Sequence, residues 1–296
     1  MEIIHLLANT VALRPYVFIF FAIYLFIAIT SVGLKRTSLF TAIAYITAFV
    51  CEYSSTHFAS GIPFGVYHYV EATRGKELWI AGVPFMDSLS FTFLSFISFR
   101  IALLLIGPRN DQTAAGPQSS IASITRSRGM VSTAALSGFL MMYLDIIIDP
   151  VTLQGKRWFL GELYVYPDHG SYFGVTLANF LGWFVVGLLI VVLFSFCERR
   201  LGSMSQPAGV LNYRFQDAAP VLLYFGILGF NLFVTFHIGE TSMGLAGLFI
   251  TMPLLMLVIF TVRGHRLHAG VLRETALSAL EESAIPEPAD LFERMG

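Results

Sequence analysis

The sequence predicts an all-α protein, a polytopic helical bundle that crosses a membrane about seven times. Hydrophobic residues make up 56% of the 296 residues and charged residues only 12%, which is too apolar for an ordinary soluble chain. Seven apolar runs are long enough to cross about 30 Å of hydrocarbon, a distance that takes about 20 helical residues. The Lys and Arg residues are unevenly divided between alternate connections, as expected for a chain held in one orientation across a bilayer.

The seven apolar runs are separated by segments rich in Gly, Pro or polar residues. The first run is long, starts after Arg14 and lacks a small-residue cleavage site, so we interpret it as a span and not as a signal peptide. In the fourth run Pro150 directly follows Asp149, which predicts that this helix ends at the aspartate. We expect spans at 15–34, 39–53, 85–106, 130–149, 172–197, 218–237 and 241–262.

The connections predict two long external loops, 54–84 and 150–171, both rich in Gly, Pro and aromatic residues. Residues 1–272 are expected to form a single transmembrane domain, and residues 273–296 an acidic, partly disordered tail. Five of the 18 Lys and Arg residues fall on the side of the amino terminus and thirteen on the other side. The positive-inside rule then places the amino terminus outside and the carboxyl terminus in the cytoplasm of a cell-membrane protein.

Acidic and amide residues mark the external ends of the predicted spans. Charged groups at membrane depth are costly and usually functional, so these residues predict a polar pocket in the outer half of the bundle, roofed by the two long loops. The residues are Glu52 at the end of the second span, Asp87 at the start of the third, Asp145 and Asp149 at the end of the fourth, Asn179 early in the fifth, and His237 and Glu240 around the last external turn.

Asp145 and Asp149 stand out in this set because four-residue spacing puts both carboxylates on one face of a helix. Asp145 lies one turn deeper, where a charge is expensive unless it is protonated, paired or facing water. Asp149, Glu52 or Asp87 taken alone could equally be a solvated residue at a helix end. The loop aromatics form either an interfacial belt or the lining of a π-rich ligand site.

Several functions are disfavoured by the residues themselves. A formal net charge of -1 offers no basic surface for nucleic acid. A retinal protein needs a lysine within a span, and the three lysines, Lys35, Lys76 and Lys156, lie outside them. The loop histidines lack metal-ligand spacing. Two alternatives stay open: a magnesium-dependent membrane prenyltransferase, for which Asp145 and Asp149 would supply one acidic motif, and a non-enzymatic lipid or pigment binding or transport protein.

Four blocks in order resemble the CruF-type carotenoid biosynthesis protein family, whose characterised members include carotenoid 1,2-hydratases and the bisanhydrobacterioruberin hydratase of haloarchaea. The blocks are GIPFGVYHY at 61–69, AGVPF at 81–85, LDIIIDPV at 144–151 and YFGVTLANFLGW at 172–183. Ordered blocks are more specific than any one of them, and together they span about half of the chain.

The resemblance implies a hydro-lyase, without a cofactor or metal, that adds water to the terminal isoprenoid double bond of an acyclic carotenoid. Protonating an alkene needs a carboxylic acid that keeps its proton near neutral pH, for which Asp145 is our candidate, with Asp149 or Glu52 as the carboxylate that stabilises the cation and orients water. The implied partners are the carotenoid, the lipid bilayer and other enzymes of the pathway. The residues expected to bind substrate are Asp87, Tyr67, His68, Tyr172, Asn179 and Trp183.

Overall fold

Seven helices are long and apolar enough to cross a membrane in the computed structural model, which describes residues 2–107, 129–200 and 213–283. Their number confirms the prediction and makes the protein a multi-pass membrane protein; its orientation stays a prediction. A shorter helix, α1 (Glu2–Leu13), precedes them. The seven are α2 (Pro15–Val32), α3 (Leu34–His57), α4 (Phe85–Ile106), α6 (Met130–Leu153), α7 (Leu177–Arg200), α8 (Tyr213–His237) and α9 (Thr241–Ser283).

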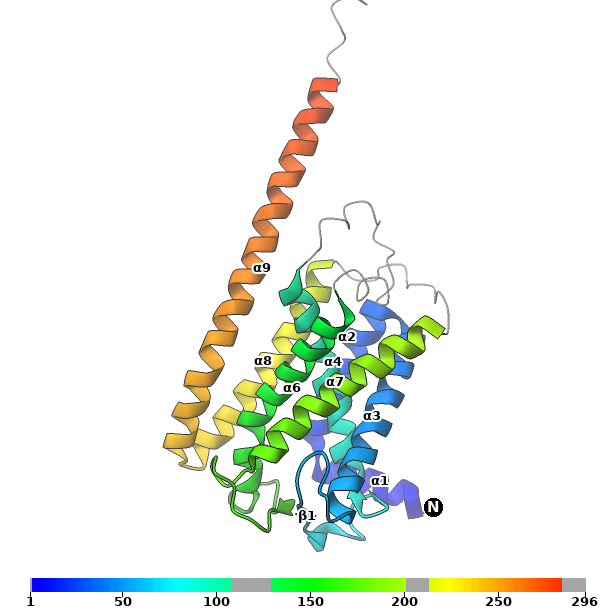
Figure 1. The fold of residues 1–296 in the computed structure, drawn as a ribbon, viewed down its shortest axis with the longest axis vertical. Helices are drawn as coiled ribbons and strands as arrows, with labels where there is room; N and C mark the ends of the chain where they lie inside the picture. The colour runs from blue at the N-terminus through cyan, green and yellow to red at the C-terminus, as the bar shows by residue number, and fades with distance from the viewer. Residues whose placement is uncertain (1, 108–128, 201–212, 284–296) are drawn as a thin grey trace, which may run out of the picture. The chain divides into compact units, whose positions relative to one another are not determined.

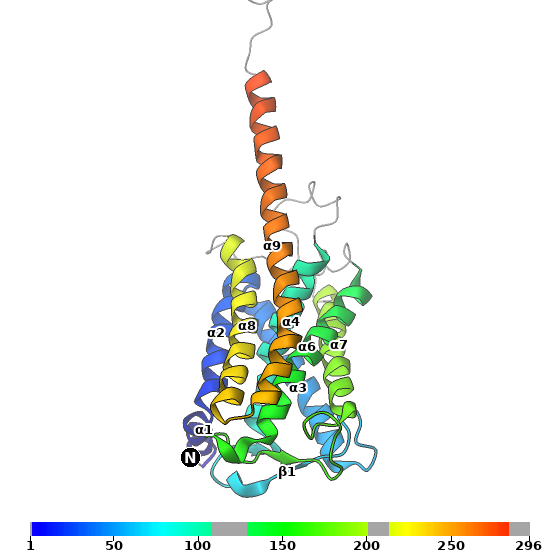
Figure 2. The ribbon, with the colours of Figure 1, turned by 90° about the vertical axis from the view of Figure 1, so that its left-hand side faces the viewer.

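The chain divides into two compact units, Met1–Met252 and Pro253–Gly296. In the first, α2, α3, α4, α6, α7 and α8 lie side by side as a bundle in both views (Figures 1 and 2). In the second, the described residues continue α9 as a single helix to Ser283. The disorder expected in the acidic tail falls on residues 284–296, outside the described part of the chain.

The carboxyl end of α6 differs from the prediction. Pro150 does not end the helix at Asp149, because α6 continues through the proline to Leu153. A proline removes one backbone N–H and crowds the carbonyl four residues earlier, which costs most in the middle of a long helix. Here only the last turn is affected, and Asp149 and Pro150 are both buried against neighbouring elements. Asp149 therefore stands on a helical turn of fixed geometry and not at a frayed end.

Helix α4 runs through the middle of the bundle, and most of its side chains are buried. Helices α6 and α7 pack closely because glycines remove side chains where the two backbones meet. A Cβ on Gly138 would lie 2.4 Å from the carbonyl oxygen of Phe184, and a Cβ on Gly187 would lie 2.8 Å from the Cβ of Met141. Small residues at such contacts are typical of membrane helix pairs. The close contact brings Asn179 of α7 beside the aspartates of α6.

The two long loops are tied to each other at one end of the bundle. Strand β1 (His68–Tyr69) pairs antiparallel with β4 (Tyr164–Val165), so Tyr69 lies opposite Tyr164. A second pair, β2 (Trp79–Ile80) and β3 (Val83–Pro84), leads into α4. Two 3₁₀ turns, η1 (Glu71–Thr73) and η3 (Gly155–Arg157), complete the loops. Figure 2 shows these segments gathered below the helices.

A buried ion pair fastens both loops to the start of α2. The Arg14 guanidinium donates from Nε to Glu77 Oε2 at 3.1 Å and from Nη2 to Glu77 Oε1 at 3.2 Å, and Nη1 donates to the carbonyl of Leu160. Glu77 belongs to the first long loop and Leu160 to the second. Arg14 and Glu77 are almost fully buried. The Arg14 side chain therefore joins three segments: the start of α2 and the two long loops.

Candidate active site

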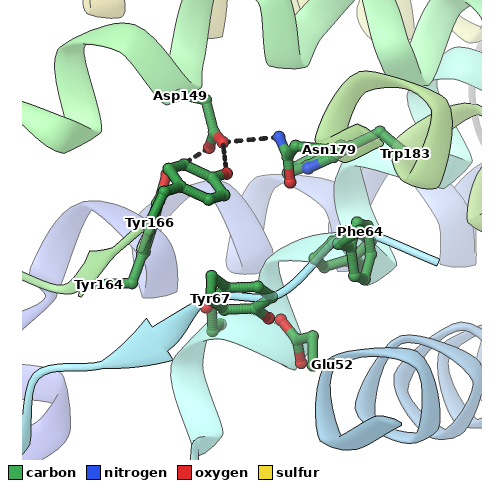
Figure 3. A pocket seen from close by; sticks show the side chains of 10 residues that line it. Glu52, Phe64, Tyr67, Asp149, Tyr164, Tyr166, Asn179 and Trp183 are labelled. Atoms are coloured by element: carbon green, nitrogen blue, oxygen red, sulfur yellow. Dashed lines mark hydrogen bonds between the residues drawn. The ribbon is translucent and has the colours of Figure 1, made fainter. Parts of the chain in front are cut away.

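A small cavity of about 30 Å³ lies where α3, α4, α6 and α7 meet the two tied loops (Figure 3). We call it the carboxyl cavity because three acidic side chains lie on its wall. Asp149 and Asn179 lie on one side of it and Glu52 on the other. The residues that line it are Glu52, Phe64, Tyr67, Asp87, Phe91, Asp149, Tyr164, Tyr166, Asn179 and Trp183.

Asp149 accepts three hydrogen bonds in this cavity. Tyr164 donates to Oδ1 at 2.5 Å, and Tyr166 and the Asn179 amide donate to Oδ2 at 3.0 and 2.7 Å. Both tyrosines come from the second loop, held in place by the β1–β4 pairing. Hydrogen bonds donated to a carboxylate stabilise its charged form. The three donors around Asp149 therefore favour its carboxylate form.

Asp145 lies one turn before Asp149 on α6, behind it as seen from the cavity, and accepts fewer hydrogen bonds. Its Oδ2 accepts from the same Asn179 Nδ2 at 2.7 Å, so that one amide bridges the two acids. The two carboxyl groups also interact with each other. Asp145 is fully buried, and its Oδ1 has no hydrogen-bond partner. A buried oxygen without a donor is costly for a carboxylate and far less so for a neutral carboxylic acid.

Glu52 and Asp87 form a second acidic pair on the facing wall. Ser88 donates to Glu52 Oε2, and Tyr69 donates to Asp87 Oδ2 at 2.6 Å. The two carboxyl groups interact with each other. Glu52 is 2% exposed, whereas Asp87 is half-buried. The cavity thus has three carboxyl groups on its wall and Asp145 behind Asp149, and these four acids come from three helices, α3, α4 and α6.

Aromatic rings fill the wall between the two acidic pairs. Phe91 stacks on Trp183, with ring centroids 4.5 Å apart and planes 28° apart. Tyr67 meets Tyr164 edge to face, with centroids 5.8 Å apart. Burial raises the pKa of Tyr67, Tyr164 and Tyr166 well above the ordinary value, and the nearby carboxyl groups raise it further. These phenols therefore remain hydrogen-bond donors at any physiological pH.

The structure brings most of the predicted site residues together. Glu52, Tyr67, Asp87, Asp149, Asn179 and Trp183 line the cavity. Asp145 touches it only through Asp149 and Asn179. His68 is exposed and lines a separate hollow over the first loop, and Tyr172 packs against Phe173 and Phe180. Neither residue lies on the cavity wall.

The turn between α8 and α9 also stands apart from the cavity. Arg157 donates to Glu240 and to the carbonyl of Ile238, forming a partly exposed ion pair. The ring of His237 stacks on Phe233. His237 and Glu240, which the sequence predicted to belong to the polar pocket, therefore make local contacts outside the cavity.

Ser88 and Phe91 are site residues that sequence reasoning missed. Both lie within a turn of Asp87 on α4, so helical spacing from that acid was the available signal. No group of three or more His, Cys, Asp or Glu side chains is arranged to hold a metal ion in the described ranges. The cavity acids find their partners among hydroxyl, phenol and amide groups instead.

Comparison with known families identifies the relatives of this chain. A family profile described as "Carotenoid biosynthesis protein" matches residues 13–254, which includes every residue of the carboxyl cavity. The chain belongs to the carotenoid biosynthesis protein family. The match extends well beyond the four sequence blocks on both sides and covers six of the seven spans in full.

Within the carotenoid biosynthesis protein family, one characterised relative gives a more specific indication. The chain is 26% identical over 176 residues to a bisanhydrobacterioruberin hydratase from Haloarcula japonica, across 60% of this chain and 50% of that protein. The chain therefore matches about half the length of this relative. No solved structure matches the chain.

Proposed function

We propose that the protein is a membrane carotenoid hydratase that adds water to the terminal isoprenoid C=C bond of an acyclic carotenoid and yields a tertiary alcohol. The observation that carries the proposal is a cavity lined by Glu52, Asp87, Asp149 and aromatic rings, with Asp145 buried behind Asp149, in a carotenoid biosynthesis protein. The hydratase name of the Haloarcula japonica relative supports the same reaction class.

The reaction needs one acid and one base on opposite sides of an alkene. The π electrons of the double bond form a C–H bond with a proton at the less substituted carbon, leaving a tertiary cation. Water attacks that cation through its oxygen and loses a proton to a carboxylate. The alkene gains one H and one OH, no electrons enter or leave, and the acids return to their starting state once the proton is passed back.

The proton source in this scheme is the Asp145–Asp149 pair. Two neighbouring carboxyl groups that share one proton are held in different protonation states by their mutual repulsion. Asp149 accepts three hydrogen bonds and fits the carboxylate, whereas Asp145 has an oxygen without a donor and fits the carboxylic acid. Asp145 holds the proton, and Asp149, which lies on the cavity wall, transfers it to the alkene.

The base in this scheme is Glu52, supported by Asp87. Glu52 lies across the cavity from Asp149, so a double bond between them would receive the proton from one face and water from the other (Figure 3). Ser88 and Tyr69 hold the two carboxyl groups in place. General acid or base catalysis by a positioned side chain typically contributes 10²- to 10⁴-fold in rate, to an order of magnitude.

Aromatic rings stabilise the cation between the two steps. The faces of Phe91 and Trp183 and the ring of Tyr67 lie on the cavity wall, and a cation over an aromatic face gains about 0.5–2 kcal/mol depending on its solvation. A hydrocarbon wall also excludes bulk water, so that attack is limited to a water held by Glu52. The cavity therefore combines acid, base and cation stabilisation without a charged ligand.

The test is production of the protein in a bacterium that accumulates lycopene or another acyclic carotenoid, followed by chromatography and mass spectrometry of the pigments. We expect a product heavier by one water, and none from the Asp145→Asn variant at equal membrane abundance. Absence of the heavier product across several acyclic carotenoids would contradict the proposal. Full activity of Asp145→Asn would remove Asp145 from its role.

A further inference from the structure

A second and larger cavity, of about 90 Å³, adjoins the carboxyl cavity. We call it the apolar cavity. The two share Asp87, Asp149, Tyr164 and Trp183, so the acids stand at the point where they meet. The remaining wall comes from α2, α4, α6, α8 and the second loop, and it includes Tyr16, Phe20, Ser90, Trp158, Ile227 and Phe230.

Three of the polar residues on this wall donate hydrogen bonds to backbone carbonyls of their own helices. Ser90 donates to the carbonyl of Asp87 at 2.7 Å, Thr152 to that of Ile148 at 2.9 Å, and Asn231 Nδ2 to that of Ile227 at 2.9 Å. Each of these groups therefore presents little unmet polarity to the cavity. A ligand would meet hydrocarbon and aromatic surface until it reaches the carboxyl groups of Asp87 and Asp149.

An aromatic cluster forms the side of the apolar cavity between α2 and α8. Tyr16 and Phe230 stack with centroids 5.8 Å apart, and Phe20 meets Phe230 edge to face at 5.9 Å. Trp158 of the second loop meets Phe230 at 6.5 Å. All four rings are half-buried, so they face the cavity and the outside of the bundle at once. Aromatic faces of this kind pack well against a flat conjugated chain.

The size of the apolar cavity limits what can lie inside it. Ligand pockets of roughly 300–1,000 Å³ enclose a drug-sized molecule, whereas this cavity holds about 90 Å³, so it can take only the end of a long polyene and not its whole length. The rest of such a chain would have to leave the bundle. The half-buried aromatic cluster between α2 and α8 lies on the side where apolar surface extends from the cavity to the outside of the bundle.

The geometry points to the apolar cavity as the binding site for one isoprenoid end of an acyclic polyene, which enters between α2 and α8 and places its terminal double bond at Asp149. This assignment rests on the proposed hydratase function and adds the path by which the substrate enters and the place where it binds. It also explains why the acids stand at the junction of two cavities, since hydrocarbon would approach from one side and water from the other.

The assignment is tested by filling the cavity with a larger side chain. Ile227 of α8 is 2% exposed and lines the apolar cavity, so Ile227→Trp should block it. Leu222→Trp is the matched control, because Leu222 is 70% exposed on the same helix. We expect Ile227→Trp to lower both the lycopene retained per purified protein and its conversion at least tenfold, and Leu222→Trp to leave both unchanged.

Ser90→Val provides a second test that disturbs the fold less, because it replaces a small side chain by an apolar one that is only slightly larger, at a half-buried position of the wall. It should lower retention and conversion in the same direction. Equal retention and conversion in a folded Ile227→Trp, or in Ser90→Val if the tryptophan variant does not fold, would overturn the assignment. A wild type that retains lycopene but never hydrates it would instead overturn the hydratase proposal, and loss of retention in Ile227→Trp would still locate the ligand.

Discussion

Asn179 is the residue on which the arrangement of the buried acids depends. Its single amide nitrogen donates to both Asp145 and Asp149, at 2.7 Å in each case, and it is 4% exposed. An amide cannot change its charge with pH, so it holds two titratable groups at a fixed separation. The Oδ2 atoms of both aspartates accept a hydrogen bond from this one amide. Asp149 is the member that also faces the cavity.

The most direct residue-level prediction concerns Asp149. Asp149→Asn keeps the shape of the side chain but removes the group that delivers the proton, so conversion should fall at least 100-fold, within the usual range for general acid–base catalysis. The measurement is product formed per unit of membrane protein. Glu240→Gln is the matched control, because Glu240 forms a surface ion pair outside the cavity and its loss should leave activity unchanged. Wild-type activity in Asp149→Asn would contradict the proton route.

A second prediction concerns Tyr164 and Tyr166. Loss of a hydrogen bond to a charged group costs about 1.5–3 kcal/mol, so Tyr164→Phe or Tyr166→Phe should lower the rate by about 10- to 150-fold. Burial beside Asp149 raises the pKa of both phenols, so they stay protonated as the pH rises to their ordinary pKa of about 10.

The tyrosine variants should therefore change the rate by the same factor at neutral and at mildly alkaline pH. The measurement is the pH profile of conversion in proteoliposomes, compared with Tyr172→Phe, whose ring lies outside the cavity. An alkaline loss of activity in the wild type that disappears in Tyr164→Phe would show that this phenol ionises within the working range, contrary to our expectation.

At the scale of elements, the contact between α6 and α7 decides where Asn179 meets the aspartates. Gly138→Ala would place a Cβ 2.4 Å from the backbone oxygen of Phe184 and should destabilise the protein by about 1–3 kcal/mol, as overpacking does. Gly229→Ala on α8 meets nothing within 4 Å and should be neutral or stabilising by up to about 1 kcal/mol. Thermal unfolding in detergent measures both. Equal unfolding temperatures would contradict close packing of α6 on α7.

The Arg14–Glu77 pair gives another element-level prediction. Arg14→Ala leaves Glu77 buried without its cation and should cost about 3–5 kcal/mol. Because the pair holds both loops over the cavity, conversion should fall as well. Arg74→Ala breaks an exposed ion pair in the same loop and should cost less than about 1 kcal/mol. Thermal unfolding and the rate of protease cleavage in the loops measure both; identical behaviour of the two variants would contradict the role of Arg14.

The sequence is informative about spans and acids but not about loop contacts. Hydropathy locates the seven spans because a bilayer selects length and apolarity directly. Charges at membrane depth identify Glu52 and Asp149 because they are rare there. The partnership of Tyr164 with Asp149 depends on a two-residue strand pairing between distant loops, which leaves no local pattern. The prediction that this helix ends at Asp149 was wrong because tertiary packing holds the last turn of α6 beyond Pro150.

At the scale of the whole molecule, the first compact unit places a group of buried carboxyl side chains inside an apolar bundle. The carboxyl cavity lies at the end where the two loops meet, and the apolar cavity extends from it between α2, α4, α6 and α8. A hydrocarbon substrate dissolved in the bilayer and water from the loop side could thus meet at the acids. The arrangement suits a reaction that joins one apolar and one polar reactant.

The central claim is tested most directly by isotope labelling with purified protein in proteoliposomes loaded with lycopene. In water enriched in ¹⁸O, we predict a tertiary alcohol whose new hydroxyl oxygen carries the label. In D₂O, the same product should gain one non-exchangeable deuterium at the adjacent carbon, and Asp149→Asn should form neither. Unlabelled product, or carotenoid that stays bound and unchanged while the protein is folded, would contradict hydration at this site.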